Sequence, residues 1–336
     1  MTIPFFPMKE KFALLLASLA SATFLLAGCA KTSEADPSIA SVAVANPNFQ
    51  ELEDAAIRGG LVVTLSNPNP APGANGNFTV FAPTNAAFAR LGLRTAADLE
   101  VLQPKFLVNT LLFHVANGAV PGSALTATAE PTASLLGPKR RIIRRADGTR
   151  YVNGSLILGT DVRAANGLIH PIDKVLLATG GNIVESAQAL QTSQVFVQPE
   201  LTFLVEAVLY TNLQGTLSSP GPFTVFAPTD QAFKDLGKAL NVPLNVPADI
   251  RKLPVATVTA VLLNHAIPGS RFTPELPENA TAATAGGQAL RFGSFTNGVL
   301  TVQGAGNGTA VANMVIPDVQ CTNGVVHVID RVLLPQ

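Results

Sequence analysis

The four histidines of the chain are its best candidates for acid–base chemistry, and each has a counterpart in a similar sequence context. His170 and His327 each lie three residues before an aspartate, Asp173 and Asp330 respectively. In an extended strand, side chains three residues apart point to opposite faces, so neither pair is placed to act as a His–carboxylate dyad. We therefore predict that both imidazoles are buried and hydrogen-bonded to the backbone, where they orient a strand.

His114 and His265 each end a stretch with helical spacing, where an imidazole can interact with the carbonyl end of the helix dipole. The sequence has no His-x-His, His-x-x-x-His or Cys-x-x-Cys spacing, and no Gly-x-Ser-x-Gly elbow. We therefore expect structural roles for all four histidines and both aspartates. We also expect no metal, no cofactor and no catalytic residues, so that the protein is not an enzyme.

One segment concentrates positive charge in a chain whose formal net charge is zero. Its cations are Lys139, Arg140, Arg141, Arg144 and Arg145, with Arg150 across a predicted turn. A basic stripe on a hairpin can bind acidic or sulfated glycans or lipid headgroups. Alternatively, it protects an edge strand from pairing with other chains. The second half of the chain has only Arg291 in the corresponding stretch, so the stripe is not a property of the fold.

The composition limits the classes of protein to consider. The 336-residue chain has 13% charged and 47% apolar residues. A charged fraction near half the usual ~25% excludes a disordered polar chain. Because nucleic-acid binders depend on an excess of Lys and Arg, zero net charge argues against that class. With 25 Pro and 27 Gly, the chain is interrupted too often for a long helical bundle. A turn-rich body of about two domains is favoured.

The first residues have the pattern of an export signal. Lys9 and Lys11 precede an apolar stretch that ends in Leu26-Ala27-Gly28-Cys29, which looks like a bacterial lipobox. We predict a lipoprotein signal peptide at 1–28, lipidation of Cys29 and a tether at 29–37. An ordinary signal peptide cut elsewhere and an uncleaved anchor are the alternatives, and translation can start at Met1 or Met8. Cys321 would then have no intramolecular partner, and we expect it to be buried.

Three sequence blocks occur twice, in the same order. They are residues 78–88 and 223–233, residues 111–114 and 262–265, and residues 166–177 and 323–334. The separation between the copies grows from 145 to 157 residues, as expected when loops differ in length and the framework does not. Since this period is too long for a solenoid, the blocks predict tandem domains at about 38–178 and 181–336.

Each predicted domain begins with helices and ends with strands. Apolar spacing predicts helices at 49–57, 105–113, 201–209 and 255–264. Strands are predicted up to Pro83 and Pro228, with Thr84 and Thr229 capping the short helices that follow. Later strands are predicted at 142–145 and 150–152 around Asp147-Gly148, and closing strands at 172–177 and 325–334. This order is typical of an α+β domain.

The repeated blocks resemble the fasciclin domain. They read Phe-Thr-Val-Phe-Ala-Pro-Thr-(Asn/Asp)-x-Ala-Phe, Leu-Leu-x-His and Asn-Gly-(Leu/Val)-(Ile/Val)-His-x-Ile-Asp-(Lys/Arg)-Val-Leu-Leu. The resemblance implies two wedge-shaped β-sandwiches flanked by several helices, and a role in cell-surface or matrix adhesion. The first copy has four extra residues between His114 and Pro121. The Tyr-His pair that some animal members direct towards integrins is Phe113-His114 here and Asn264-His265 in the second copy, so the resemblance does not extend to an integrin contact.

These observations predict a non-catalytic, lipid-anchored protein of the bacterial cell envelope that mediates adhesion or matrix interaction. Its expected partners are the membrane, through the N-terminal lipid, and an unidentified surface protein or polysaccharide, with no nucleic acid. The outer membrane is the favoured destination, facing either the periplasm or the exterior. The alternative is a glycan- or small-ligand-binding module that uses the basic hairpin at 139–150.

Overall fold

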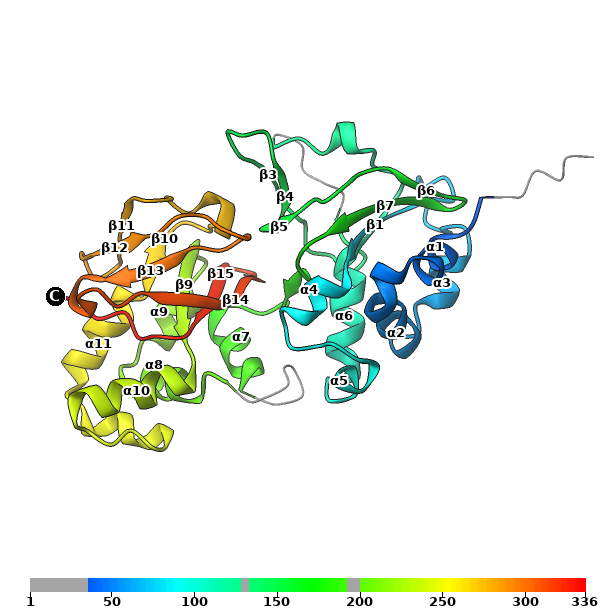
Figure 1. Cartoon of the computed structure of the whole chain (residues 1–336). Helices are drawn as coiled ribbons and strands as arrows, with labels where there is room; N and C mark the ends of the chain where they lie inside the picture. The colour runs from blue at the N-terminus through cyan, green and yellow to red at the C-terminus, as the bar shows by residue number, and fades with distance from the viewer. Residues whose placement is uncertain (1–35, 128–132, 192–199) are drawn as a thin grey trace, which may run out of the picture. The chain divides into compact units, whose positions relative to one another are not determined.

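Each repeat is built around a parallel pair of strands that joins its first and last sequence blocks (Figure 1). The computed structural model describes residues 36–127, 133–191 and 200–336. The predicted signal peptide, Cys29 and most of the predicted tether lie outside these described residues. None of the helices in the described ranges has the length and apolar character needed to span a membrane.

In the first domain, β1 (Phe78–Pro83) and β7 (Gly167–Ile172) pair in parallel over their full length. They form the centre of a sheet of order β2-β1-β7-β6, with β2 at Val115–Asn117 and β6 at Val162–Ala164. A separate sheet has the order β3-β4-β5, and its strands are Ile142–Arg144, Arg150–Val152 and Ser155–Leu156.

In the second domain, one sheet has the order β10-β9-β15-β14-β13-β12-β11 (Figure 1). The strands, in chain order, are β9 Phe223–Pro228, β10 Ala266–Pro268, β11 Thr281–Ala283, β12 Ala289–Phe292, β13 Thr301–Gly304, β14 Ala312–Cys321 and β15 Gly324–Ile329. The register of β14 on β15 shifts twice. The N-terminal end of β14 also pairs with β13, so this strand links the two halves of the sheet.

Helices cover one face of each central strand pair. The first domain has α1 Ile39–Ala45, α2 Gln50–Arg58, α3 Val62–Ser66, α4 Asn85–Ala89, α5 Ala96–Glu100 and α6 Pro104–His114. The second has α7 Ile183–Leu190, α8 Thr202–Tyr210, α9 Gln214–Ser218, α10 Asp230–Leu240 and α11 Val255–Asn264. Thr84 and Thr229 cap α4 and α10, as predicted.

The cores follow the two-residue alternation of the strands. Val80 and Ala82 of β1 belong to the apolar cluster under the helices, whereas Phe81 belongs to a cluster with Ile142 and Val152 of the smaller sheet. In the second domain, Val225, Ala227 and Phe226 divide in the same way. In each domain the central strands therefore lie between a helix layer and further strands, which form a separate sheet in the first domain and continue the same sheet in the second.

The closing strands end earlier in the sequence than predicted: β7 ends at Ile172, and β15, predicted at 325–334, ends at Ile329. In the first domain the strand is β7, and Asp173 ends it by accepting hydrogen bonds from the Ser155 hydroxyl (3.1 Å) and the Leu156 amide (2.6 Å). The prediction at 172–177 was therefore wrong, because a run of β-branched and leucine residues continues past the polar turn. The segment after this turn forms β8 (Leu177–Ala178), which pairs in parallel with β14 and so adds a strand to the second domain.

The asparagine of the Asn-Gly pair at the start of each closing strand is hydrogen-bonded to the first helices of its domain. Asn166 accepts the Ile39 amide of α1 at 2.8 Å and donates to the Leu65 and Asn67 carbonyls at 2.9 and 2.8 Å. Asn323 makes the equivalent three bonds in the second domain. The amide thus ties the first helices to the last strand.

We predict that Gly167→Ala destabilises the first domain strongly. A Cβ at this position would lie 2.0 Å from the Phe78 carbonyl oxygen, in a backbone conformation with φ +150°. We expect a loss of about 2–4 kcal/mol in the free energy of unfolding, measured with urea. Gly159→Ala is the control, because a Cβ there has open space. Equal stability of the two variants would contradict the prediction.

Candidate functional site

His114 and His265 are buried, neutral side chains that connect a helix to the end of the domain. His114 is 1% exposed, and its Nε2 accepts the Leu176 amide at 2.9 Å. The proton therefore lies on Nδ1, which donates to the Thr110 carbonyl at 2.7 Å. His265 makes the same two kinds of bond. Burial lowers the pKa of both imidazoles to about 4, so neither carries charge towards the helix dipole at neutral pH.

His170 and His327 have the opposite tautomer in the closing strands. The Asp161 amide donates to Nδ1 of His170 at 3.2 Å, and the Asp318 amide donates to Nδ1 of His327 at 3.1 Å. Each Nε2 then donates to a loop carbonyl, at 2.9 Å in the first domain and 3.0 Å in the second. Burial is the main cause of the lowered pKa of both rings. An imidazole with both nitrogens bonded to backbone has no free nitrogen for a substrate.

The predicted aspartates are engaged by other groups. The Asp173 carboxylate accepts from Ser155 and Leu156, and it forms a 3.2 Å ion pair with Arg90. Asp330 accepts from the backbone and side-chain amides of Asn313, both at 2.7 Å. These bonds fix the chain just beyond each closing strand.

The structure does not present the basic segment as one exposed stripe. Arg140 is only 2% exposed. Its guanidinium lies 5.0 Å from the centre of the Phe81 ring and 6.0 Å from that of Phe113, and it donates to the Phe113 and Val115 carbonyls. Burial lowers its pKa to about 10, which still leaves it charged at neutral pH. The expectation that Arg140 is available to an external ligand is therefore wrong.

Two of the other arginines contact the second domain. Arg141 forms a 2.9 Å ion pair with Glu275, and Arg145 is paired with Glu278. Each guanidinium also lies over a phenylalanine ring of the second domain, at 4.9 and 4.2 Å from the ring centres. Since both ion pairs and both rings belong to the other domain, these arginines act as a clamp between the domains. Neither sequence interpretation included this role.

Of the remaining three cations, one is bonded within the first domain and two are exposed. Arg150 donates to the carbonyl of Gly122, within the first domain. The side chains of Lys139 and Arg144 are exposed. Any acidic ligand on this hairpin would therefore first meet Lys139 and Arg144.

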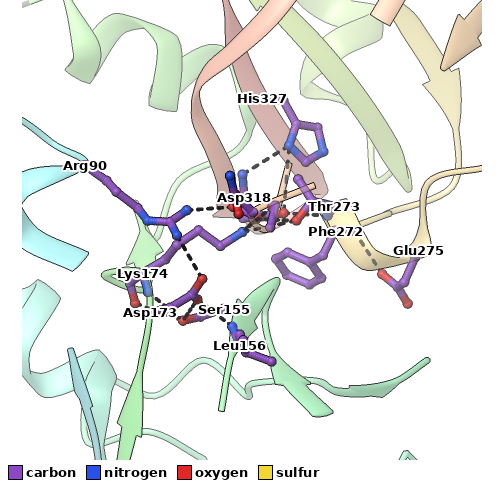
Figure 2. Close-up of polar contacts among 12 residues, drawn as sticks. Arg90, Ser155, Leu156, Asp173, Lys174, Phe272, Thr273, Glu275, Asp318 and His327 are labelled. Carbon is purple, nitrogen blue, oxygen red and sulfur yellow. Dashed lines mark hydrogen bonds and ion pairs between the residues drawn. The ribbon is translucent and has the colours of Figure 1, made fainter. Parts of the chain in front are cut away.

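A buried polar cluster lies at the junction of the two domains (Figure 2). The Lys174 ammonium, 8% exposed, lies 2.6 Å from the Asp318 carboxylate and donates to the Gly298 carbonyl at 2.9 Å and the Thr273 hydroxyl at 3.2 Å. Asp318 also accepts the backbone amide of Thr273 at 2.6 Å and its hydroxyl at 2.8 Å. We call Lys174, Asp318, Thr273 and Gly298 the junction cluster.

Two neighbouring side chains extend this cluster (Figure 2). Arg90, the residue after α4, bridges Asp173 of its own domain and the Asn297 carbonyl of the second domain, at 3.2 and 2.9 Å. His327 Nδ1 lies 3.9 Å from the Asp318 carboxylate. The cluster therefore connects Lys174, just after β7 of the first domain, to Asp318 in β14 and His327 in β15 of the second.

Sequence reasoning missed Asp318, although the signal was present. The closing block extends further towards the N-terminus than we recognised, as Asp-Val-x-x-x-Asn-Gly-x-x-His, beginning at Asp161 and Asp318. Asp161 accepts the Gly122 amide at 2.8 Å within its own domain. Asp318 makes the corresponding bond and also binds Lys174. An aspartate shared by both copies thus has an additional partner in only one of them.

Other reactive chemistry finds little support in the described part of the chain. No group of three or more His, Cys, Asp or Glu side chains there could hold a metal ion. Cys321 is buried, and burial raises the pKa of its thiol to about 11, so it is protonated at neutral pH. Cys29 lies outside the described residues.

Comparison with known families decides the identity of the repeated unit. The model of the fasciclin domain matches the chain twice, over residues 47–178 and 199–335. The chain belongs to the fasciclin domain family. It consists of two tandem fasciclin (FAS1) domains of the α+β class, which confirms the predicted family and fold class. The boundaries at 38–178 and 181–336 stay predictions.

Several curated relatives share these fasciclin domains. Transforming growth factor-beta-induced protein ig-h3 of Oryctolagus cuniculus is 30% identical over 263 residues, 77% of this chain and 35% of that protein. Human periostin is 27% identical over 260 residues, 77% of this chain and 28% of periostin. The chain thus spans about a third of the length of these two relatives.

Two further matches are a bacterial protein and a solved structure. The cell surface glycolipoprotein MPB83 of Mycobacterium bovis is 35% identical over 102 residues, 30% of this chain and 44% of that protein. A FAS1 domain pair from the insect cell adhesion molecule fasciclin I matches over 85% of this chain and 96% of that one. Its identity is 18% and its TM-score is 0.38.

The buried histidines predict a loss of stability in mild acid. For His114 and His265 the unfolded state has the ordinary pKa of 6.5 and the folded state about 4, so the unfolded state binds more protons between these values. The contribution of these imidazoles to stability is complete well above pH 6.5 and falls as the pH drops towards 4, by about 3 kcal/mol for each histidine. Urea unfolding at pH 7, 5.5 and 4.5 measures this. His114→Gln and His265→Gln should each show a shallower pH dependence, and a flat profile in the unmodified protein would refute the prediction.

The junction cluster predicts a large effect of removing its ammonium. Lys174→Met leaves the Asp318 charge buried with one partner fewer, and we expect a cost of about 3–5 kcal/mol in the free energy of unfolding. Lys238→Met is the control, because Lys238 pairs with Asp235 at the surface, where both side chains are more than half exposed. Similar unfolding energies for the two variants would show that the cluster contributes little.

Proposed function

We propose that this protein is anchored to a bacterial cell envelope by a lipid on Cys29, and that its two fasciclin domains bind a partner on a neighbouring surface or in the extracellular matrix. The proposal is carried by one combination: two fasciclin domains, of a family associated with adhesion, follow a sequence that looks like a lipobox. A relative named as a cell surface glycolipoprotein, MPB83, supports the same location.

The chemistry of the described residues supports binding rather than catalysis. Both ring nitrogens of every histidine are bonded to backbone groups, and the Cys321 thiol is protonated. Imidazoles and thiols are among the groups that a hydrolase or transferase uses as base or nucleophile.

The contacts at the junction support a fixed arrangement of the two domains towards a partner. A buried ion pair, two arginine clamps and the β8–β14 pairing join the domains. Because a buried ion pair is stable only in one arrangement, these contacts favour a fixed relation between the domains. Residues of both domains then present a single preorganised surface to a partner, which lowers the entropy lost on binding.

Lipid attachment and adhesion are tested together in bacteria that express the full chain. We expect the protein to incorporate a labelled fatty acid, to fractionate with membranes, and to increase retention of the cells on immobilised matrix material. Cys29→Ser should abolish the label and the membrane fraction, and with them cell retention. Cys321→Ala, which removes the other cysteine, should leave all three readouts unchanged.

The outcomes separate the two parts of the proposal. A labelled Cys29→Ser protein would rule out the anchor, and labelled, membrane-bound protein without any gain in cell retention would rule out adhesion. Retention that disappears with Arg144→Glu and weakens with salt would favour the alternative, an acidic-glycan site on the hairpin at 139–150. Arg140 is unsuitable for this test, because reversing a buried charge disrupts the fold.

A further inference from the structure

Each domain encloses an apolar cavity between its first three helices and the helix-facing side of its sheet. The cavity of the first domain, beneath α1, α2 and α3, has a volume of about 120 Å³. The cavity of the second domain, beneath α7, α8 and α9, has about 70 Å³.

Repeat-equivalent side chains line the two cavities. Leu111 and His114 contribute in the first domain, and Leu262 and His265 in the second. Both nitrogens of each imidazole are bonded to backbone, and the ring is neutral, so it adds no unmet polar group to the wall. A wall of this kind offers water no hydrogen-bond partner, which favours apolar molecules in the cavity.

Two substitutions between the copies open space in the first cavity. Ala40 and Ala56 line it where Val184 and Val208 line the second. Each alanine leaves the space of two carbon atoms open. The larger volume is therefore a property of the first domain's own side chains, whereas the framework around it is common to both.

The rims of the two cavities also differ in composition. Val44 and Ile57 line the first cavity although they are 61% and 58% exposed, so apolar surface continues from the cavity to the outside of the domain. In the second domain Gln188 takes the place of Val44, whereas Val205 takes the place of Glu53. Exposed valine and isoleucine side chains at the mouth of an apolar cavity suit a ligand that stays apolar where it leaves the cavity.

We propose that the first domain binds an apolar molecule through a ring-sized or branched hydrocarbon end group, which fills the cavity between α1 and α2. The rest of the molecule lies over Val44 and Ile57. An apolar cavity of about 150 Å³ lined by leucine, isoleucine and phenylalanine side chains binds benzene. The first cavity, at about 120 Å³, approaches this volume, whereas the second, at about 70 Å³, has less than half of it.

The test uses benzene as the probe and the two repeats as each other's control. Ligand-detected NMR should show one benzene bound per chain of the unmodified protein. Ala40→Val combined with Ala56→Val gives the first cavity the side chains of the second, and should weaken binding at least tenfold without lowering the thermal midpoint. Val184→Ala combined with Val208→Ala should create a second site in the same protein.

Each result bears on the proposal. Binding that is lost with the two valines and doubled with the two alanines assigns the site to the cavity. No binding of benzene to the unmodified protein, or binding unchanged by the valine pair, overturns it, since the void is then only a packing defect or the ligand lies elsewhere. Because the alanine pair predicts a gain of binding, poor folding of the valine variant does not leave the question open.

Discussion

The parallel pairing of the first and last long strands is the constraint on which each domain depends. In the first domain this pairing brings Gly167 against Phe78 across most of the domain's sequence, and only a residue without a Cβ fits there. Once the strands are paired, the histidine in the middle of the closing strand has no access to solvent. Its two nitrogens must then be satisfied by backbone groups, and the loops on both sides of the strand supply them. The strand pairing, the position of Gly167 and the hydrogen bonds of the histidine thus depend on one another.

The same constraint explains how the domains are joined. Asp318 lies at the turn of β14 that donates to His327, and its carboxylate binds both Thr273 of its own domain and Lys174 of the first. The junction therefore uses a carboxylate that the second domain already needs for its own loop. Removing two charges from water is costly, and the ion pair recovers this cost only when every hydrogen bond in the cluster is made. We infer that the junction contributes more to the fixed arrangement of the domains than to their stability.

Local signals in the sequence were sufficient for the strand and cap of the first repeated block, but they could not predict contacts between residues far apart in the chain. The strands ending at Pro83 and Pro228, and their threonine caps, depend on neighbouring residues, so the repeat predicted them correctly. The prediction of one exposed basic stripe failed because arginines of this segment have different environments. Arg140 is buried in the core, whereas the partner of Arg145 lies 133 residues away. No spacing rule connects residues so distant. The partnership of Lys174 with Asp318, 144 residues apart, was hidden for the same reason.

The residues that differ between the two copies give each domain its own contacts and cavity. Positions that agree, such as the asparagine-glycine pairs and the four histidines, maintain the fold in both domains. At the position of Lys174 the second copy has Arg331, which donates to the Val311 carbonyl of its own domain. The same cationic position therefore serves the junction in one copy and the local fold in the other. Ala40 and Ala56 likewise enlarge a cavity that valines reduce in the second domain. Because the framework tolerates either choice, the residues that differ are free to determine which surfaces and cavities are available for binding.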